Sequence, residues 1–370
     1  MPAVLVVGSL IGVLIWIDRG SEKEQLPEVV RVPGLGGEAL AFIDGRTLVA
    51  AARPASLIVR KFDRLPMRSS LDVRIPDEVS LPWPKIHQDR PRSLGLGVRD
   101  MAVGPGGRTI AVAGNAGPTP ERKEKLWGGV TLPTGGLPYG VARLWDTGAR
   151  KWGAAWPAYE QSANAIDISP DGRLVAIGAE TLEIREAATG RLVRDGSSFQ
   201  RDGAPDSPIT RAFHVAFSPD GRTVAAGSVR EVMLNDLVTG RAAPLNSAPM
   251  VQECAEALAF SPDGRLLATV GQGILRLSDT RTRTPVADLT AGDGNMVAFS
   301  PDGRFLVTVS NVHGTARLWN VATRRQIAVF PSPPGGLGSL AFSPDGTTVA
   351  LSSTSPSVLM WNVTRYTRPR

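Results

Sequence analysis

Short apolar runs separated by polar turn residues recur along the chain from residue 39 to its end. In runs such as Leu258–Phe260 and Leu266–Ala268, the density of apolar residues is that of strands packed between neighbouring sheets. One phrase stands between these runs, and its fullest form is Ala-Phe-Ser-Pro-Asp-Gly-Arg at Ala216–Arg222. Proline sets φ for the first central residue of a type I turn, aspartate suits the second, and glycine accepts the left-handed conformation that follows. The phrase therefore predicts a tight turn between two antiparallel strands.

Seven copies of this turn are spaced regularly enough to form one repeat architecture. They are centred on Gly45, Gly107, Gly172, Gly221, Gly264, Gly303 and Gly346. From Gly172 onward the intervals are 49, 43, 39 and 43 residues, close to the period of about 40 to 45 expected for a four-stranded propeller blade. The two earlier intervals, 62 and 65, carry insertions. The copies predict seven sheets arranged in tandem.

A third strand is expected in each repeat, ending in an aromatic and acidic pair or a remnant of one. The seven pairs are Phe62-Asp63, Trp145-Asp146, Arg185-Glu186, Asn235-Asp236, Ser278-Asp279, Trp319-Asn320 and Trp361-Asn362. Turns of the type Thr-Gly-Arg follow three of them and lead into a fourth, outer strand; they are Thr147–Arg150 in a loosened form, Thr189–Arg191 and Thr239–Arg241. In these residues the chain resembles the WD40 family. The resemblance implies an all-β, seven-bladed propeller over residues 27–366.

The chain departs from the family in its histidines. Many WD40 repeats carry Gly-His before the first strand and Asp before the third, whereas here His214 falls inside a first strand and His313 in a turn. We therefore expect the blades to rest more on apolar packing.

The last repeat lacks residues for its fourth strand, because only seven residues follow Val363. A β-like segment, Glu28–Val32, stands before the first repeat. As the family's closure habit implies, we expect it to supply the outer strand of blade seven. Closure leaves only short, protected sheet edges.

The amino terminus carries an uncharged apolar run, residues 3–17, that ends in Trp16-Ile17. A helix of 15 to 17 residues spans roughly 22 to 26 Å, the short limit for crossing a bilayer. A cleaved signal peptide and a start site placed too late are the alternatives, but no basic residue precedes the run and its end is bulky, which favours an uncleaved anchor. We expect an anchor helix over residues 1–18, a linker over 19–26, and a single-pass membrane protein.

The side of the membrane stays open. Arg19, Lys23 and Arg31 follow the apolar run, and a positive-inside count leans towards a cytoplasmic propeller.

A net charge of +6 does not by itself indicate nucleic acid, because the 41 basic residues, mostly arginine, are scattered and many recur at one place in the repeat. The single cysteine, Cys254, excludes an intrachain disulfide and a Cys-rich metal site. His87, His214 and His313 are the ordinary candidate bases, and they are far apart in the repeat pattern. We therefore expect no catalytic residues, no metal and no cofactor.

Two insertions are the candidate binding elements. Residues 64–98 enlarge the connection into blade two, and residues 114–140 enlarge its turn between second and third strands; the family layout implies that both open on one face. Within the second, we single out Arg122, Lys123, Lys125 and Trp127 as a candidate partner-binding loop, because an aromatic beside cations is a common interface anchor. A solvated loop whose tryptophan tucks against its own blade is the alternative.

The sequence thus favours a membrane-tethered, non-catalytic and monomeric scaffold for a protein partner. A propeller enzyme, a hydrolase or a quinone-type oxidoreductase working at the central channel, is one alternative. A basic surface that binds anionic lipid or nucleic acid is another.

Overall fold

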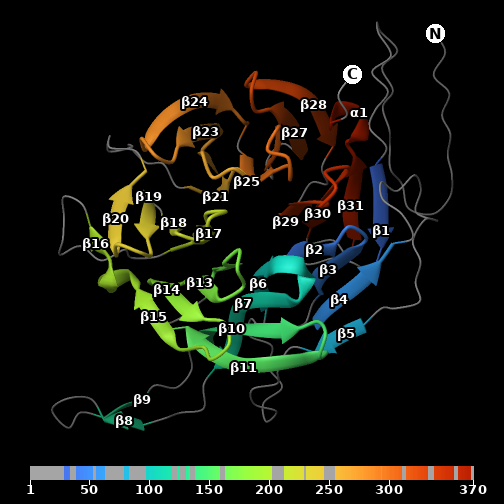
Figure 1. Cartoon of the computed structure of the whole chain (residues 1–370). Coiled ribbons are helices and arrows are strands. Elements are labelled where there is room, and N and C mark those ends of the chain that lie inside the picture. The colour runs from blue at the N-terminus through green and yellow to red at the C-terminus, as the bar shows by residue number, and fades with distance from the viewer. Residues whose placement is uncertain are drawn as a thin grey trace, which may run out of the picture.

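Seven β-sheets stand around a common axis in the computed structural model (Figure 1). The structure describes residues 29–33, 39–52, 56–62, 79–82, 97–118, 123–125, 131–133, 138–158, 163–201, 212–228, 231–245, 255–292, 294–310, 314–331, 337–353 and 357–367. The predicted all-β, seven-bladed propeller is confirmed.

The first four blades follow the chain from the inside of the ring outward. Blade one consists of β2 (Leu40–Asp44), β3 (Thr47–Ala52), β4 (Ser56–Lys61) and β5 (Val79–Pro82). Blade two consists of β6 (Gly97–Val103), β7 (Thr109–Pro118), β10 (Pro138–Asp146) and β11 (Lys151–Ala158), with the 3-10 turn η2 (Pro105–Gly107) after β6. Blade three consists of β12 (Ala165–Ile168), β13 (Leu174–Gly178), β14 (Leu182–Glu186) and β15 (Leu192–Asp195), followed by η3 (Gly196–Ser198). Blade four consists of β17 (His214–Phe217), β18 (Thr223–Gly227), β19 (Val232–Asp236) and β20 (Arg241–Pro244), and β16 (Gln200–Arg201) pairs in parallel with β20.

The last three blades repeat the same order. Blade five consists of β21 (Ala257–Phe260), β22 (Leu266–Gly271), β23 (Ile274–Asp279) and β24 (Thr284–Thr290). Blade six consists of β25 (Gly294–Phe299), β26 (Phe305–Ser310), β27 (Thr315–Asn320) and β28 (Arg325–Pro331). Blade seven consists of β29 (Leu337–Phe342), β30 (Thr348–Ser353) and β31 (Ser357–Asn362), and the short helix α1 (Thr364–Thr367) follows it.

The ring closes through the amino-terminal strand. β1 (Val29–Pro33) pairs antiparallel with β31 as the outer strand of blade seven, with Val29 opposite Trp361 and Pro33 opposite Ser357. The predicted closure is confirmed. Because blade seven contains strands from both ends of the chain, separating it requires breaking the ring.

The hydrophobic core is divided among the interfaces between blades. Among the described residues, seven clusters of buried side chains are present, and each joins residues of two neighbouring blades. At the closing interface, for example, Phe42 and Leu48 of blade one pack with Val358 and Met360 of blade seven. The strands carry apolar side chains on both faces because each sheet is covered on both sides.

The insertions differ in part from expectation. The segment 64–98 is not one connection, because it contains β5, the outer strand of blade one. That strand is only four residues long and ends in proline, so its pattern is too short to be recognised in the sequence. The segment 114–140 begins as an extension of the hairpin formed by β7 and β10, which pair as far as Pro118 opposite Pro138.

Within the described residues, no helix has the length and apolar character needed to cross a bilayer. The predicted anchor, residues 1–18, and the linker, residues 19–26, lie outside the described residues.

Candidate functional site: the turn face

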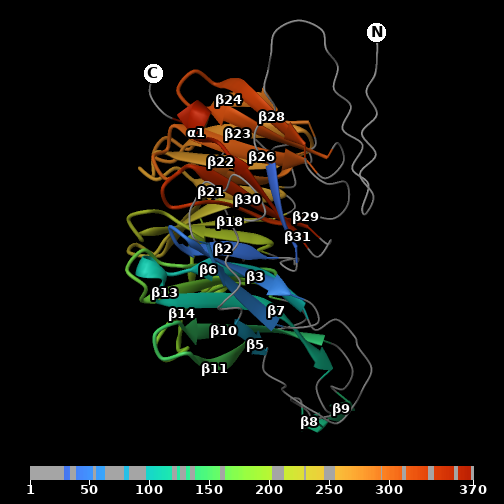
Figure 2. The ribbon, with the colours of Figure 1, turned by 90° about the vertical axis from the view of Figure 1, so that its right-hand side faces the viewer.

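One face of the ring gathers the tight turns of every blade, and we call it the turn face. It carries the turns between first and second strands and those between third and fourth strands, because alternate connections of an antiparallel sheet lie on the same side. Figure 2 shows η2 and α1, which follow a first and a third strand, at the left side of the ring. The opposite face carries the other connections, including the segment between β7 and β10.

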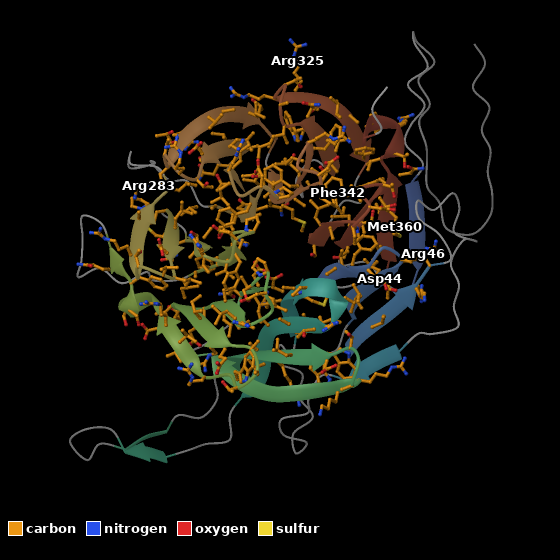
Figure 3. The ribbon with its side chains drawn as sticks, in the orientation of Figure 1. Asp44, Arg46, Arg283, Arg325, Phe342 and Met360 are labelled. Carbon is orange, nitrogen blue, oxygen red and sulfur yellow. The ribbon has the colours of Figure 1, made fainter. Side chains whose placement is uncertain are left out.

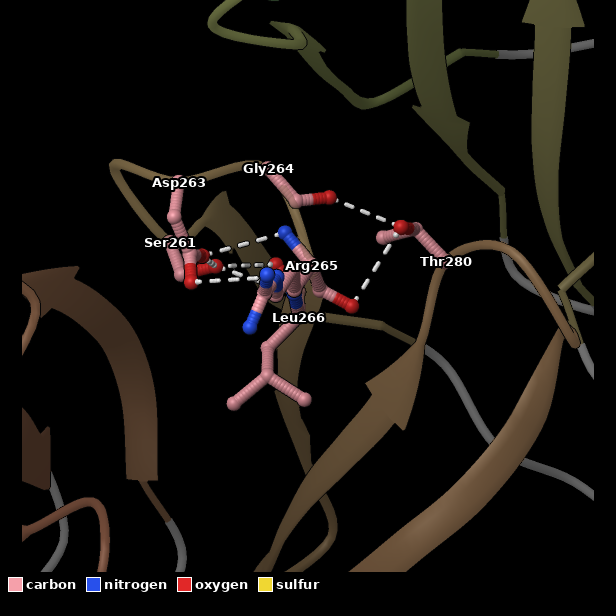
Figure 4. A network of polar contacts seen from close by, with 6 residues as sticks. All are labelled: Ser261, Asp263, Gly264, Arg265, Leu266 and Thr280. Atoms are coloured by element: carbon pink, nitrogen blue, oxygen red, sulfur yellow. Dashed lines mark hydrogen bonds and ion pairs between the residues drawn. The ribbon is translucent and has the colours of Figure 1, made fainter.

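The first–second turns are held by a serine and an aspartate (Figure 4). In blade five the Ser261 hydroxyl donates to Asp263 Oδ1 over 2.6 Å and accepts from the Leu266 amide over 2.9 Å. The same serine-to-aspartate bond of 2.6 Å is present in blades three, four, six and seven. The serine hydroxyl lowers the pKa of Asp263. These carboxylates belong to the turn structure.

Neighbouring turns pack on one another around this face. The position that a Cβ would take on Gly172 is 3.3 Å from Pro105 Cγ of the preceding blade, and the same holds for Gly303 and Pro262 Cδ. Both glycines have φ near +70°, as the turn requires. Gly45 differs, since its φ is not positive and no atom lies within 4 Å of its Cβ position. Blade one has a shorter turn, without Ser-Pro, at the seam of the ring.

The third–fourth turns differ among blades at one left-handed position. Blades three and four use Gly190 and Gly240, both with φ of 72°. A Cβ on Gly190 would overlap the indole ring of Trp156 from the preceding blade, with Cε2 at 2.6 Å. Blades two, five and six instead hold Arg150, Arg283 and Arg324 there, with φ between 51° and 60°. A left-handed conformation costs an ordinary residue about 1 kcal/mol or more, so these arginines are strained.

The net positive charge of the turn face comes from these third–fourth turns. The arginine after the turn glycine is exposed in six blades, as Arg46, Arg108, Arg173, Arg222, Arg265 and Arg304, but six turn aspartates balance this set. The third–fourth turns of blades two, five and six add Arg150, Lys151, Arg281, Arg283, Arg324 and Arg325. Only Asp146 and Asp279 oppose them within those turns, because blade six has Asn320 at the corresponding position. The excess is therefore concentrated in these three turns, and exposed Arg365 after β31 adds one more cation.

Three titratable groups lie on the innermost strands of blades two, three and four. Asp100 accepts from the amides of Met101, at 2.8 Å, and of Ile166 in the next blade, at 2.9 Å. Asp167 accepts in the same way from Ile168 and, at 2.7 Å, from Phe217 of the next blade.

Burial shifts the pKa of all three groups towards the neutral form. It raises the pKa of Asp100 to about 7 and that of Asp167 to about 6, against the effect of their amide donors. Burial lowers the pKa of His214 to about 4. The two carboxylates join adjacent blades, which is a structural use of groups that sequence reasoning overlooked. Asp167 stands where the repeated phrase has alanine, as at Ala216, and this departure was the sequence signal that could have identified it.

A small hollow of about 190 Å³ lies between the first–second turns of blades four and five. Leu234 and Phe260 line it together with Asp220, Asp263 and Arg281. It is smaller than the roughly 300 to 1,000 Å³ of ligand pockets. Its size suits one side chain of a partner.

The predicted partner-binding residues lie on the segment between β7 and β10. Lys123 and Lys125 are the ends of β8 (Lys123–Lys125), which pairs with β9 (Thr131–Pro133) in a ribbon that stands away from the ring in both views (Figures 1 and 2). Arg122 and Trp127 lie outside the described residues, as do His87, His313 and Cys254. No group of three or more His, Cys, Asp or Glu among the described residues is placed to hold a metal ion.

A family model for the eukaryotic translation initiation factor eIF2A matches residues 275–366, about a quarter of the chain. The match runs from β23 through blades six and seven to α1. A comparison with curated proteins finds no match. The family match and the seven blades together support a propeller family.

Proposed function

We propose that this chain is a membrane-tethered propeller of the WD40 type and a non-catalytic, monomeric scaffold for a protein partner. The observation that carries the proposal is the β8–β9 ribbon, which stands outside a closed ring and on the side opposite the turn face. A ring whose neighbouring blades are joined by buried apolar clusters is a rigid support for such an element. Binding residues held on a rigid scaffold lose less entropy when a partner binds.

The groups nearest the axis support a non-catalytic role. Asp100 and Asp167 each use both carboxylate oxygens on main-chain amides. These bonds give each carboxylate a structural role at the joint between two neighbouring blades. The enzyme alternative would be supported if Asp100→Asn or Asp167→Asn abolished a measurable activity without unfolding the ring.

The scaffold role is tested by removing the ribbon alone. Because Pro118 and Pro138 are directly paired, residues 119–137 can be replaced by a four-residue turn without changing the register of β7 and β10. Proteins recovered by the intact chain and lost by this variant identify the partner. Arg222→Ser, an exposed change on the turn face, is the matched control and should recover the same proteins as the wild type. Equal recovery by all three chains would refute the role of the ribbon.

The tether is tested separately, by fractionation. We expect the full chain to stay with membranes in high salt and in carbonate, and residues 19–370 to be released. Release of the full chain by salt alone would refute an anchor in residues 3–17.

A second candidate is a role in translation, favoured by the match of residues 275–366 to the initiation factor family. Co-sedimentation of residues 19–370 with ribosomal subunits would support it. Loss of that association in the ribbon-less variant would join the two proposals, since the partner would then be ribosomal.

A further inference from the structure

We infer that the turn face docks on an anionic membrane surface through the third–fourth turns of blades five and six. The inference deepens the tethered scaffold proposed above and rests on it for the position of the N-terminal segment. It assigns one face of the ring to lipid and leaves the opposite face, with the β8–β9 ribbon, to the protein partner.

The chain reaches the ring at the turn face. β31 runs towards this face, and β1 pairs antiparallel with it, so Val29 opposite Trp361 is the end of β1 that lies there. Residues 18–28 connect the apolar segment to Val29, and eleven residues span at most about 40 Å. A membrane that holds residues 3–17 therefore lies within that distance of the turn face, at the edge of blade seven. Blade six is the direct neighbour of blade seven. The tether thus keeps the adjacent turns at a high effective concentration near lipid.

The turns of blades five and six present cations on the turn face. Blade five contributes Arg281 and Arg283, and blade six contributes Arg324 and Arg325. Figure 3 shows Arg325 pointing outward from the rim of the ring and Arg283 at the rim on the side opposite β1. Cations close to an anionic leaflet contribute about 1 kcal/mol each.

Blade six keeps the turn geometry while omitting its negative charge. In blade five Asp279 accepts from the Thr282 amide over 2.6 Å. In blade six Asn320 accepts from the Thr323 amide over 2.9 Å in the same arrangement. The side-chain cap is preserved and the carboxylate is gone, which raises the net charge of the blade-six turn.

The backbone provides an independent sign of use. Arg283 and Arg324 occupy the left-handed position where Gly190 and Gly240 stand in blades three and four. Glycine would relieve the strain in both turns, so retaining arginine there is costly for folding alone. Strain of this kind is commonly found at binding sites.

An exposed aliphatic group favours lipid over the other anionic partners. Val238, in the third–fourth turn of blade four, is 72% exposed, the most of any large hydrophobic side chain in the described part of the chain. A headgroup layer accepts both cations and a shallow aliphatic side chain. Nucleic acid and an acidic protein offer the charge without an apolar layer beneath it.

The test uses residues 19–370, since the ring closes through β1 and needs no anchor to do so. Binding is measured by co-sedimentation with vesicles of phosphatidylcholine alone and with about one third phosphatidylserine, and by fluorescence polarisation with a single-stranded oligonucleotide. The variant is Arg281→Ser, Arg283→Gly, Arg324→Gly and Arg325→Ser together; the two glycine changes relieve strain, so it should fold. The control removes cations from the opposite side, as Arg99→Ser, Lys123→Ser and Lys125→Ser together.

We expect binding to serine-containing vesicles only, weakening with salt, and falling about a hundredfold or more in the turn-face variant. The control should bind as the wild type does. Absence of vesicle binding, or an equal loss in both variants, would overturn the docking of this face. Tighter binding to the oligonucleotide with the same variant dependence would replace lipid by nucleic acid. Because the anchor is missing from this protein, failure here leaves the tether to be judged by the extraction experiment.

Discussion

Gly190→Ala tests how adjacent blades are locked on the turn face. Gly190 lies in the left-handed region with φ of 72°, and the indole of Trp156 from blade two lies directly over it. Trp156 is buried within the apolar cluster between blades two and three. A methyl group at position 190 therefore meets two penalties, one from the backbone and one from the ring above it.

The two penalties are separable in magnitude. The left-handed conformation costs a non-glycine residue about 1 to 2 kcal/mol, and overpacking a filled interface costs about 1 to 3 kcal/mol more. Gly190→Ala should then cost about 2 to 5 kcal/mol. Gly172→Ala is the matched control, because Gly172 has the same φ of 72° but its Cβ position is 3.3 Å from a proline ring. It should cost about 1 to 2 kcal/mol.

Thermal and guanidinium unfolding measure both variants. At about 2.1 cal/mol/K per residue, 1 kcal/mol shifts the melting temperature of a chain this long by about 1.3 °C. We expect a fall of about 3 to 6 °C for Gly190→Ala and about 1 to 3 °C for Gly172→Ala. In a Trp156→Ala background the effect of Gly190→Ala should shrink to that of Gly172→Ala. Equal effects of the two glycine changes in the wild type would refute the interblade lock.

Further predictions concern pH, strain and closure. Burial raises the folded pKa of Asp167 to about 6, above the unfolded value of about 3.9. Protonated Asp167 therefore stabilises the folded chain fully below about pH 4, and this stabilisation is lost as the pH rises through 6. Between pH 4 and 7.5, calorimetry should show the unfolding free energy of Asp167→Asn rising by up to about 3 kcal/mol relative to that of the wild type. His214 gives the opposite dependence on pH, because burial lowers its folded pKa to about 4. The unfolding free energy of His214→Gln should therefore rise relative to that of the wild type as the pH falls from 6.5 towards 4, and a constant difference would contradict this. Arg283→Gly and Arg324→Gly should each stabilise by about 0.5 to 1 kcal/mol in guanidinium unfolding, and a loss of stability would argue against strain in these turns. Deleting residues 27–33 removes β1 from blade seven, and an unchanged melting temperature would contradict its role in closing the ring.

The fold was predictable because its determinants are local and repeated. The turn phrase needs particular residues for particular dihedral angles, so seven copies indicate seven hairpins. The segment Glu28–Val32 was recognisable because the last repeat lacks a strand. β5 was not, since four residues ending in proline carry too little pattern.

The candidate site was less accessible to sequence reasoning. The bond from the Ile166 amide to Asp100 spans 66 residues and that from Phe217 to Asp167 spans 50. Such contacts depend on which blades become neighbours, and the type of residue alone does not show them. The arginines at left-handed positions were hidden for a related reason, because only the observed φ values distinguish Arg283 from an ordinary turn residue.

In a repeat protein, the residue type at one position of the repeat recurs in every blade that follows the repeat. Binding residues are therefore best sought where a blade departs from it. In five blades the arginine after the turn glycine is accompanied by an aspartate two residues before it, as at Asp220 and Arg222. Arg108 without such an aspartate and Asp345 without such an arginine offset one another, so the repeated unit adds almost no net charge to the turn face. Charge accumulates only where blades depart from the repeat, through arginine in place of glycine and through Asn320 in place of an acid. Departures that cost folding energy without improving packing are the positions at which a binding role is best sought.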